Sequence, residues 1–556
     1  MNTRSHATVL HELLDLPGAG ADAPAVTCGE VTLTRAELVR AAHRCAAALR
    51  ARGLRRGDRL VVTSDSGPVL VPLLFGASRL GVVFSVLHEQ VRGDVLRHVL
   101  ADCEPALAVA ASPATRAAVR EAGVAVVAPE DIDDLSPAAA TGPAAAATGD
   151  PSDTDPAAGH ASDTDPTAGD TSESEPAADA ASETDSAAGA ASGTGPAADD
   201  GPLPVDPVCL IYTSGTTAMP KAVVSTHQQM MFAVHAIAER LEYRADDVVY
   251  CPLPLSFDYG LYQVFLGALA GSHVWLGSAT ESGPALLANL VRSQATVLPA
   301  VPPVSAALVR LLRRRRDAQR PPLRLLTNTG AALPADIPHA LREELPGLSV
   351  RLMFGLTECK RLTISEPDED VIRPGSCGLP LTGTEVFVVD EEGRRLPAGE
   401  VGEITVRGAN VMAGYWRRPE LTATRFPRRD GLFPELRTGD YGWTDEDGRL
   451  YFAGRRDDIY KQDGFRVSAI EVEAAARRLP DVDTAAVLPP DATRPEAVLV
   501  VTGTADPATV LPRLREHLED YKVPRTCHAV DALPVNANGK TAKAVLAGRL
   551  AEAGRD

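Results

Sequence analysis

A run of hydroxyl side chains follows an apolar stretch near the middle of the chain. It reads Ile211-Tyr-Thr-Ser-Gly-Thr-Thr-Ala-Met-Pro-Lys221, and Val208-Cys-Leu-Ile-Tyr212 before it is typical of a buried strand. A turn rich in donors, with a lysine within reach, suits the oxygens of a triphosphate. It is not a Walker A loop, because GxxxxGK[ST] is absent. Taken alone, the segment could also be a polar turn without a ligand.

Six further short motifs follow this loop in the chain. They are Thr329-Gly-Ala-Ala-Leu-Pro334, Phe354-Gly-Leu-Thr-Glu358, Arg437-Thr-Gly-Asp440, Gly454-Arg-Arg-Asp-Asp458, Gly464-Phe-Arg-Val467 and Asn538-Gly-Lys540. With the loop ending at Lys221, they resemble the motifs of the adenylate-forming superfamily, in the same order and over nearly the full chain. That superfamily contains the acyl-CoA synthetases and the adenylation domains of peptide synthetases. A ligand-free polar turn does not account for such a series.

The resemblance implies ATP and Mg²⁺ as cofactors. The implied nucleotide-binding residues are Thr213, Ser214, Gly215, Thr216, Thr217, Lys221, Gly330, Ala331, Phe354, Thr357, Asp440 and Arg455. Asp440 is expected to accept hydrogen bonds from both ribose hydroxyls, and Thr357 to bond the α-phosphate. Glu358 and Thr213 are the expected metal ligands, since a hard cation prefers oxygen. Small residues at 330 and 331 let adenine lie against the backbone.

The same resemblance implies a two-step reaction. A carboxylate attacks the α-phosphate of ATP to give an acyl-adenylate and pyrophosphate, and a thiol then displaces AMP. The expected catalytic residues are Lys221, Glu358 and Lys540, and Lys540 bridges the substrate carboxylate and the phosphate while negative charge builds up. Between the steps a small C-terminal domain rotates about a hinge at Asp457, which brings Gly464 to the channel for the thiol arm.

Two short segments carry information about the acid. Asp258 resembles the aspartate that pairs with a substrate amine in peptide synthetases, but some acyl-CoA ligases carry the same segment, which favours a structural role. Tyr259 and Tyr262 are expected to line the same pocket. Arg361, after Lys360, is either a surface or ribose-side residue, or a cation that holds a second anionic group of the substrate or co-substrate.

The hydroxyl-rich loop departs from the family at two places. Ala218 and Ala222 stand where glycine is common. A methyl group at a backbone position with positive φ costs about 1 kcal/mol, so a slower adenylation step is expected there. Loss of activity is not expected, because Lys221 and Lys540 are retained.

Three functions follow, in order of preference. The first is a stand-alone ligase of secondary metabolism, such as antibiotic biosynthesis, that activates a small acid, aromatic or amine-bearing, for CoA or a separate carrier protein. The second is an ATP-dependent diazotase, in which nitrite is activated and captured by an aryl amine. Asp258, Lys360 and Arg361 make that conceivable. The third, a degenerate nucleotide-binding protein, is disfavoured because the catalytic residues are present.

The composition argues against several other classes of protein. The net charge is −19, but the twelve acidic residues between 152 and 201 supply −12 of it, so the remainder is only mildly acidic and has no nucleic-acid footprint. The eight cysteines form no CxxC pair, which argues against a zinc site and for reduced thiols in the cytoplasm. No signal peptide and no apolar run of membrane length is found.

The elements that must position these residues alternate between strand and helix. Thr34 and Glu37 form a capping box before a helix that ends near Gly53, and strands are predicted at 58–63 and 106–110. The predicted fold is α/β, with a large N-terminal multi-sheet domain and a small mobile C-terminal α+β domain. The predicted boundaries are 1–136 and 205–455 for the large domain, 137–204 for a disordered acidic decapeptide-repeat insert, and 456–556 for the small domain, which is expected to close with a strand and a tail.

Overall fold

The computed structural model describes most of the chain apart from one long internal segment. The described residues are 7–16, 20–65, 67–133, 135, 201–213, 219–278, 283–315, 319–429, 433–455, 458–462, 465–491, 494–535 and 541–553. The predicted repeat insert lies outside the described residues except for 201–204. Its disorder and the predicted domain boundaries therefore stay predictions.

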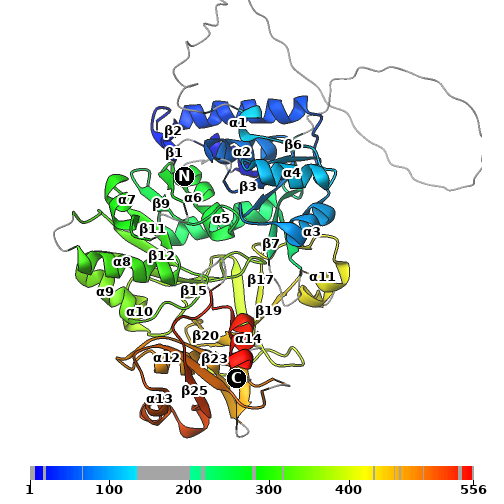
Figure 1. Ribbon diagram of the computed structural model, residues 1–556. Coiled ribbons are helices and arrows are strands. Elements are labelled where there is room, and N and C mark those ends of the chain that lie inside the picture. The colour runs from blue at the N-terminus through cyan, green and yellow to red at the C-terminus, as the bar shows by residue number, and fades with distance from the viewer. Residues whose placement is uncertain are drawn as a thin grey trace, which may run out of the picture. The chain divides into compact units, whose positions relative to one another are not determined.

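The first sheet combines strands from both sides of that segment (Figure 1), in the order β18-β8-β7-β4-β3-β5-β6. The strands are β3 (Arg59–Thr63), β4 (Val83–Leu87), β5 (Leu107–Val109), β6 (Val126–Val127), β7 (Pro207–Thr213), β8 (Lys221–Thr226) and β18 (Gly414–Tyr415). The helices are α1 (Arg35–Ala51), α2 (Leu70–Arg79), α3 (Gly93–Cys103) and α4 (Pro113–Glu121). Strands β4 and β7 are parallel neighbours, with Phe84 opposite Cys209. The chain thus resumes in the same sheet after the predicted insert.

Helix α1 begins where the sequence predicts it. The Glu37 carboxylate accepts a hydrogen bond from the Thr34 amide at 2.8 Å, and the Thr34 hydroxyl accepts one from the Glu37 amide at 3.3 Å. This is the expected capping box. Leu38, Cys45 and Leu49 form the buried face of the helix. The predicted strands at 58–63 and 106–110 are β3 and β5.

The second sheet has the order β15-β14-β13-β12-β11-β9-β10-β1-β2. Its strands are β1 (Pro24–Cys28), β2 (Val31–Thr34), β9 (Val248–Cys251), β10 (His273–Leu276), β11 (Val297–Ala300), β12 (Leu325–Asn328), β13 (Ser349–Phe354), β14 (Thr363–Ile364) and β15 (Leu379–Pro380). Its helices are α5 (His227–Leu241), α6 (Asp258–Ala270), α7 (Leu286–Arg292), α8 (Pro302–Arg314), α9 (Asp336–Glu344) and α10 (Glu369–Ile372). The run from β10 through β9, β11 and β12 to β13 is parallel, so the loops after β12 and β13 leave the same edge.

One apolar core joins the two sheets. It contains Phe84 of β4, Leu74 of α2, Met230 of α5 and Phe265 of α6. Helix α6 is buried from its first residue through Gly267. Because its first residue is an aspartate, the helix brings a carboxylate to the rim of this core, where a charged group needs a partner.

The third sheet and the C-terminal module follow. The sheet is antiparallel, with β16 (Thr384–Val389), β17 (Gly402–Gly408), β19 (Leu436–Thr444) and β20 (Leu450–Arg455), and α11 (Pro419–Arg425) precedes β19. The module has β21 (Ile459–Gln462), β22 (Phe465–Ser468), α12 (Ala469–Ala476), β23 (Val482–Leu488), β24 (Val498–Gly503), α13 (Pro507–Leu514), β25 (Thr526–Ala529) and α14 (Lys543–Ala553). It has an apolar core of its own. The predicted fold class is confirmed. A tail was expected after the last strand, whereas the structure has helix α14, whose Leu546 packs into a small cluster with Leu488 and Val500.

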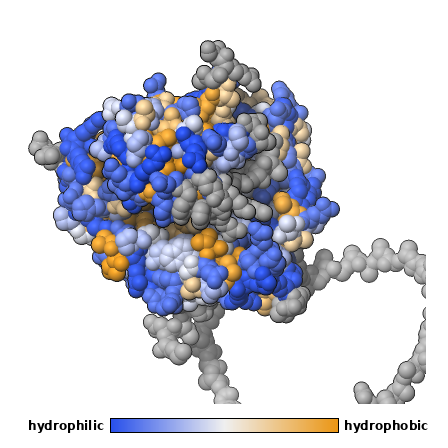
Figure 2. Space-filling model, turned by 90° about the horizontal axis from the view of Figure 1, so that it is seen from below, coloured by the Kyte–Doolittle hydropathy of each residue, from blue (hydrophilic) through white to orange (hydrophobic). Residues whose placement is uncertain are grey.

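The face in Figure 2 is largely hydrophilic, with small separate apolar spots. Among the described residues, the most exposed large hydrophobic side chains are those of Phe433, Ile372, Val371 and Val535. No helix in this part of the chain is long and apolar enough to cross a membrane.

Candidate active site

The two ends of the hydroxyl-rich loop lie side by side. Strand β7 ends at Thr213 and β8 begins at Lys221, and these residues face each other in the antiparallel ladder, with the Thr213 hydroxyl 3.5 Å from the Lys221 carbonyl oxygen. Ser214, Gly215, Thr216 and Thr217 lie outside the described residues, as does Ala218. The ladder therefore fixes where the predicted phosphate loop leaves and re-enters the sheet.

Tyr415 lies between Lys221 and Glu358, the predicted metal ligand. The Lys221 ammonium is 4.0 Å from the centre of the Tyr415 ring, and the Tyr415 hydroxyl donates to Glu358 Oε1 at 2.7 Å. Glu358 is only 8% exposed. Burial lowers the pKa of Lys221, and the Glu358 carboxylate partly offsets that effect. Burial and the same carboxylate raise the pKa of Tyr415, which keeps its hydroxyl a donor.

The predicted ribose carboxylate lies on β19. Asp440 is buried, and its Oδ1 is 3.2 Å from Nε of Arg455, which faces it across the β19–β20 ladder. The Asp440 amide donates to the Thr438 hydroxyl at 3.1 Å. Arg425, at the end of α11, donates to the Thr438 carbonyl and also acts on the pKa of Lys221 and Tyr415. Arg425 thus acts on both the predicted ribose side and the predicted phosphate side.

The predicted adenine platform follows β12. Gly330 has φ of +88°, which glycine adopts readily, and a Cβ there would lie 3.7 Å from Val301 and 3.9 Å from Phe257. The Asn328 side chain donates to the carbonyl of Ala331 at 3.1 Å and fixes the turn. An exposed backbone and an aromatic edge meet here, which suits a flat base.

The turn after β13 is wound tightly. A Cβ on Gly355 would overlap the carbonyl oxygen of Lys360, and Lys360 itself has φ of +63°. The Asn410 amide donates to the carbonyls of Cys359 and Arg361, both at 3.1 Å. A non-glycine residue in the left-handed region costs about 1–2 kcal/mol. The surrounding contacts hold this strain next to Glu358. The half-buried Thr357 lies in the same turn, and Phe354 contacts Phe452 at 5.1 Å between ring centres.

Three charged side chains meet where the substrate pocket is predicted. Arg361 Nη1 is 3.8 Å from Asp258 Oδ2, and its guanidinium lies 4.8 Å from the Tyr259 ring centre. The Lys360 ammonium donates to the Thr357 carbonyl at 3.1 Å. Lys360, Asp258 and Arg361 are 1%, 4% and 5% exposed. Burial lowers the pKa of Lys360, and Asp258 partly offsets this. A surface position for Arg361 is therefore wrong.

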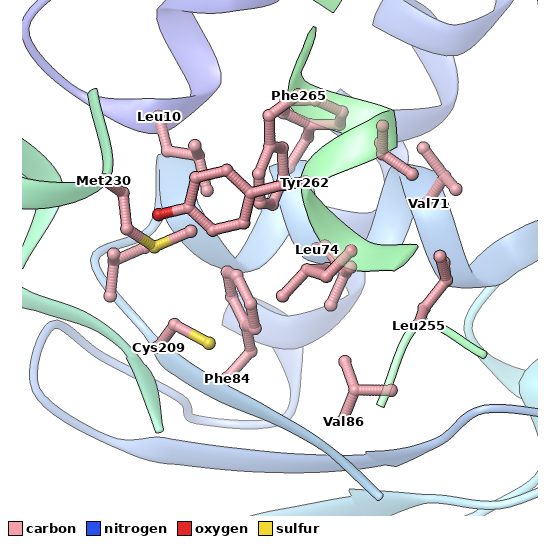
Figure 3. Packing of buried hydrophobic residues seen from close by; sticks show 14 of the residues in the cluster. Leu10, Val71, Leu74, Phe84, Val86, Cys209, Met230, Leu255, Tyr262 and Phe265 are labelled. Carbon is pink, nitrogen blue, oxygen red and sulfur yellow. The ribbon is translucent and has the colours of Figure 1, made fainter. Parts of the chain in front are cut away.

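The two tyrosines of α6 differ in position. The Tyr259 hydroxyl donates to the Thr327 carbonyl at 2.8 Å and so ties α6 to β12. Figure 3 shows Tyr262 among apolar side chains, with its hydroxyl pointing toward Met230. That hydroxyl has no hydrogen-bond partner in the described structure. Lys360 lies 5.8 Å from the Tyr262 ring centre. Tyr262 is thus a core residue whose ring lies next to the buried Lys360.

Several expected residues cannot be compared with the structure, and two contributors were missed. Lys540, Asp457 and Gly464 lie outside the described residues.

Tyr415 and Arg425 were not anticipated, because their partners are remote in sequence and a lone tyrosine or arginine gives no local signal. Ala222 lies opposite Tyr212 in extended backbone, so the cost expected for a methyl group at positive φ does not apply there.

The residues present suit Mg²⁺ held mainly by substrate. Among the described residues there is no cluster of three metal-binding side chains. Mg²⁺ commonly takes one or two carboxylates and completes its shell with phosphate oxygens and water. The buried carboxylate of Glu358, which shares Tyr415 with the Lys221 ammonium, fits that pattern.

Lys221, Glu358 and Asp440 are the lysine and the two carboxylates that the resemblance predicts for an AMP-forming ligase, and the described structure buries both carboxylates. The chain belongs to the AMP-binding enzyme family: the AMP-binding enzyme profile matches residues 17–416, and the AMP-binding enzyme C-terminal domain profile matches 471–540. This family uses ATP, and the predicted superfamily is confirmed.

Three relatives illustrate the range of the family. A feruloyl-CoA synthase from Amycolatopsis sp. is 30% identical over 94% of each chain. The L-proline–[L-prolyl-carrier protein] ligase of Streptomyces coelicolor is 35% identical over 61% of this chain and 65% of its own length. The solved structure of VinN with L-aspartate is 34% identical, with a TM-score of 0.63, over 81% of this chain and 99% of VinN. CoA ligases and carrier-protein ligases are thus both among the relatives.

Proposed function

We propose that this enzyme adenylates an amino dicarboxylic acid and transfers the acyl group to a thiol, either of CoA or of a separate carrier protein. The observation that carries the proposal is the buried group of Asp258, Lys360 and Arg361. It offers one anion and two cations within a single site. An acid with an amine and a second carboxylate has the complementary charges.

The charges of this group do not cancel. With all three side chains ionised, one positive charge is left over in a region that is almost closed to water. A buried charge is costly unless it is paired and hydrogen-bonded. The partner of the Lys360 ammonium is a neutral carbonyl. A second carboxylate on the substrate would supply the missing anion and would bond both cations.

The amine has an equally specific partner. Asp258 begins α6, and its separation of 3.8 Å from Arg361 exceeds an ordinary hydrogen bond. An ammonium group could approach the carboxylate without displacing a strong bond. The third functional group is the reacting carboxylate. It would then face the nucleotide, on the side of Glu358.

The relatives support this class of substrate over the others considered. L-Aspartate, bound to VinN, carries an amine and two carboxylates. The proline ligase is named for an amine-bearing acid, and the feruloyl-CoA synthase for an aromatic acid. An aromatic acid would leave Lys360 and Arg361 without an anion. The diazotase alternative is not favoured, because the relatives reported above are named for carboxylic acids.

On this proposal the chain's residues divide the work. Lys221 binds the phosphate oxygens, and Asp440 bonds the ribose. Glu358, with Thr213, would hold Mg²⁺, which would neutralise charge on the phosphates when bound. Lys540, assigned by its motif, bridges the reacting carboxylate and the α-phosphate.

A panel of acids tests the proposal through pyrophosphate release. L-Aspartate, succinate, β-alanine and ferulate are compared, each with CoA and with a phosphopantetheine carrier protein, and nitrite is tested separately. L-Aspartate should exceed succinate and β-alanine by at least about tenfold in kcat/KM, since each lacks one charge-assisted bond. Higher activity with ferulate, or pyrophosphate released only with nitrite, would overturn the proposal.

A further inference from the structure

One aromatic ring separates two opposite charges in the nucleotide site. The Lys221 ammonium contacts the face of Tyr415 at 4.0 Å, while the hydroxyl at the far end of the ring bonds Glu358 at 2.7 Å. Lys221 therefore contacts the ring and not the carboxylate. A cation on a tyrosine face is attracted by the ring, though less strongly than by a carboxylate at contact.

The position of the ring is fixed from several sides. Tyr415 pairs with Val223 in the β18–β8 ladder, and its amide donates to the Thr422 hydroxyl at 3.0 Å. Its ring meets Phe426 edge-on, with ring centres 5.5 Å apart. A Cβ on the preceding Gly414 would overlap the Thr422 side chain, and its φ is +121°. The backbone and the side chain of Tyr415 are thus both held.

We infer that Tyr415 is a positioning residue that prevents Lys221 and Glu358 from forming an ion pair with each other. The inference rests on the proposed function, in which Lys221 receives the phosphates and Glu358 receives the metal. If the two side chains paired, ATP would have to break that pair before either could act. With the ring in place, the lysine stays open to phosphate and the hydroxyl orients the carboxylate.

The two contacts can be removed separately. Tyr415→Phe retains the ring and removes the bond to Glu358. Tyr415→Leu removes both and lets Lys221 reach Glu358. A third variant, Tyr415→Leu with Glu358→Gln, again removes the ring but leaves no carboxylate for the lysine to pair with.

Binding of mant-ATP in EDTA, followed by fluorescence, measures the lysine side without metal and without turnover. Tyr415→Leu should raise the Kd about tenfold, and adding Glu358→Gln should restore it to within about twofold of Glu358→Gln alone. Tyr415→Phe should leave this Kd unchanged. In a separate titration with Mg²⁺, it should raise by about fivefold the Mg²⁺ concentration that gives half of the metal-induced increase in nucleotide affinity. Melting temperatures of all variants accompany the titrations.

Rescue is the decisive result, because a merely structural defect is not repaired by a second substitution. Equal Kd values for Tyr415→Leu and the double variant would overturn the inference. If Tyr415→Leu does not fold, Tyr415→Phe with wild-type Mg²⁺ dependence would overturn it instead. Failure of the wild-type chain to bind mant-ATP would refute the proposed function, which is a distinguishable outcome.

Discussion

Lys360→Met removes one buried cation and keeps a flexible side chain of similar length. The lysine is 1% exposed, and its partner in the described structure is a single carbonyl. If a substrate carboxylate bonds it, the variant loses a charge-assisted hydrogen bond worth about 1.5–3 kcal/mol. That corresponds to roughly 10- to 150-fold in kcat/KM for an amino dicarboxylic acid. Arg361 remains, so some affinity for the second carboxylate is retained.

The assay compares L-aspartate with β-alanine, which lacks the second carboxylate, by pyrophosphate release. The kcat/KM for L-aspartate should fall, while that for β-alanine and the KM for ATP should change little. The melting temperature should stay level or rise, because a buried charge is removed. Arg351→Met is the matched control: it removes a buried cation whose partner is the Ser365 carbonyl at 2.8 Å. Equal losses for both acids, or no loss for L-aspartate, would refute the reasoning.

The remaining predictions concern other parts of the chain. Lys540→Ala should slow adenylation by about 100-fold or more while transfer from preformed acyl-adenylate survives; equal losses in both half-reactions would contradict the role assigned to it. Deleting 152–201 should leave kcat and Tm nearly unchanged, because the segment offers little apolar surface to bury; a large drop in Tm would disprove this. Burial lowers the pKa of His227 to about 4, below its unfolded value, so the unfolded state binds more protons between pH 6.5 and 4. The free energy of unfolding should therefore fall by up to about 3 kcal/mol as pH falls through that window. Denaturant titrations of His227→Gln should show a shallower pH dependence.

Much of the architecture could be predicted because its signals are local. The capping box at Thr34 and the apolar run before Thr213 each lie within a few residues, and α1 and β7 form there. Helix α14 was missed because its apolar face is short, and it packs on strands that are distant in sequence. A pattern within one segment does not show which remote surface will cover it.

The site shows the same division. Motifs point to Lys221, Glu358 and Asp440 because each lies in a short run with a recognisable resemblance. Tyr415 was missed because its role arises from contacts with two other segments of the chain. Arg361 was expected either at the surface or the ribose side, or on a second anionic group of the substrate, and its burial removes only the surface position.

The turn after β13 brings the predicted nucleotide site and the proposed acid site close together. Glu358 faces Tyr415, whereas Lys360 and Arg361, two and three residues later, belong to the group proposed to bind the acid. The change of direction occurs within the stretch where Lys360 has φ of +63° and where Gly355 leaves room for its carbonyl. A relaxed turn would point Lys360 elsewhere. The strained turn therefore directs the Glu358 carboxylate, the predicted metal ligand, and the Lys360 ammonium, the proposed anion-binding group, in different directions. On the proposed function, acid and ATP are therefore aligned by one rigid segment, and a change in its backbone should disturb both at once.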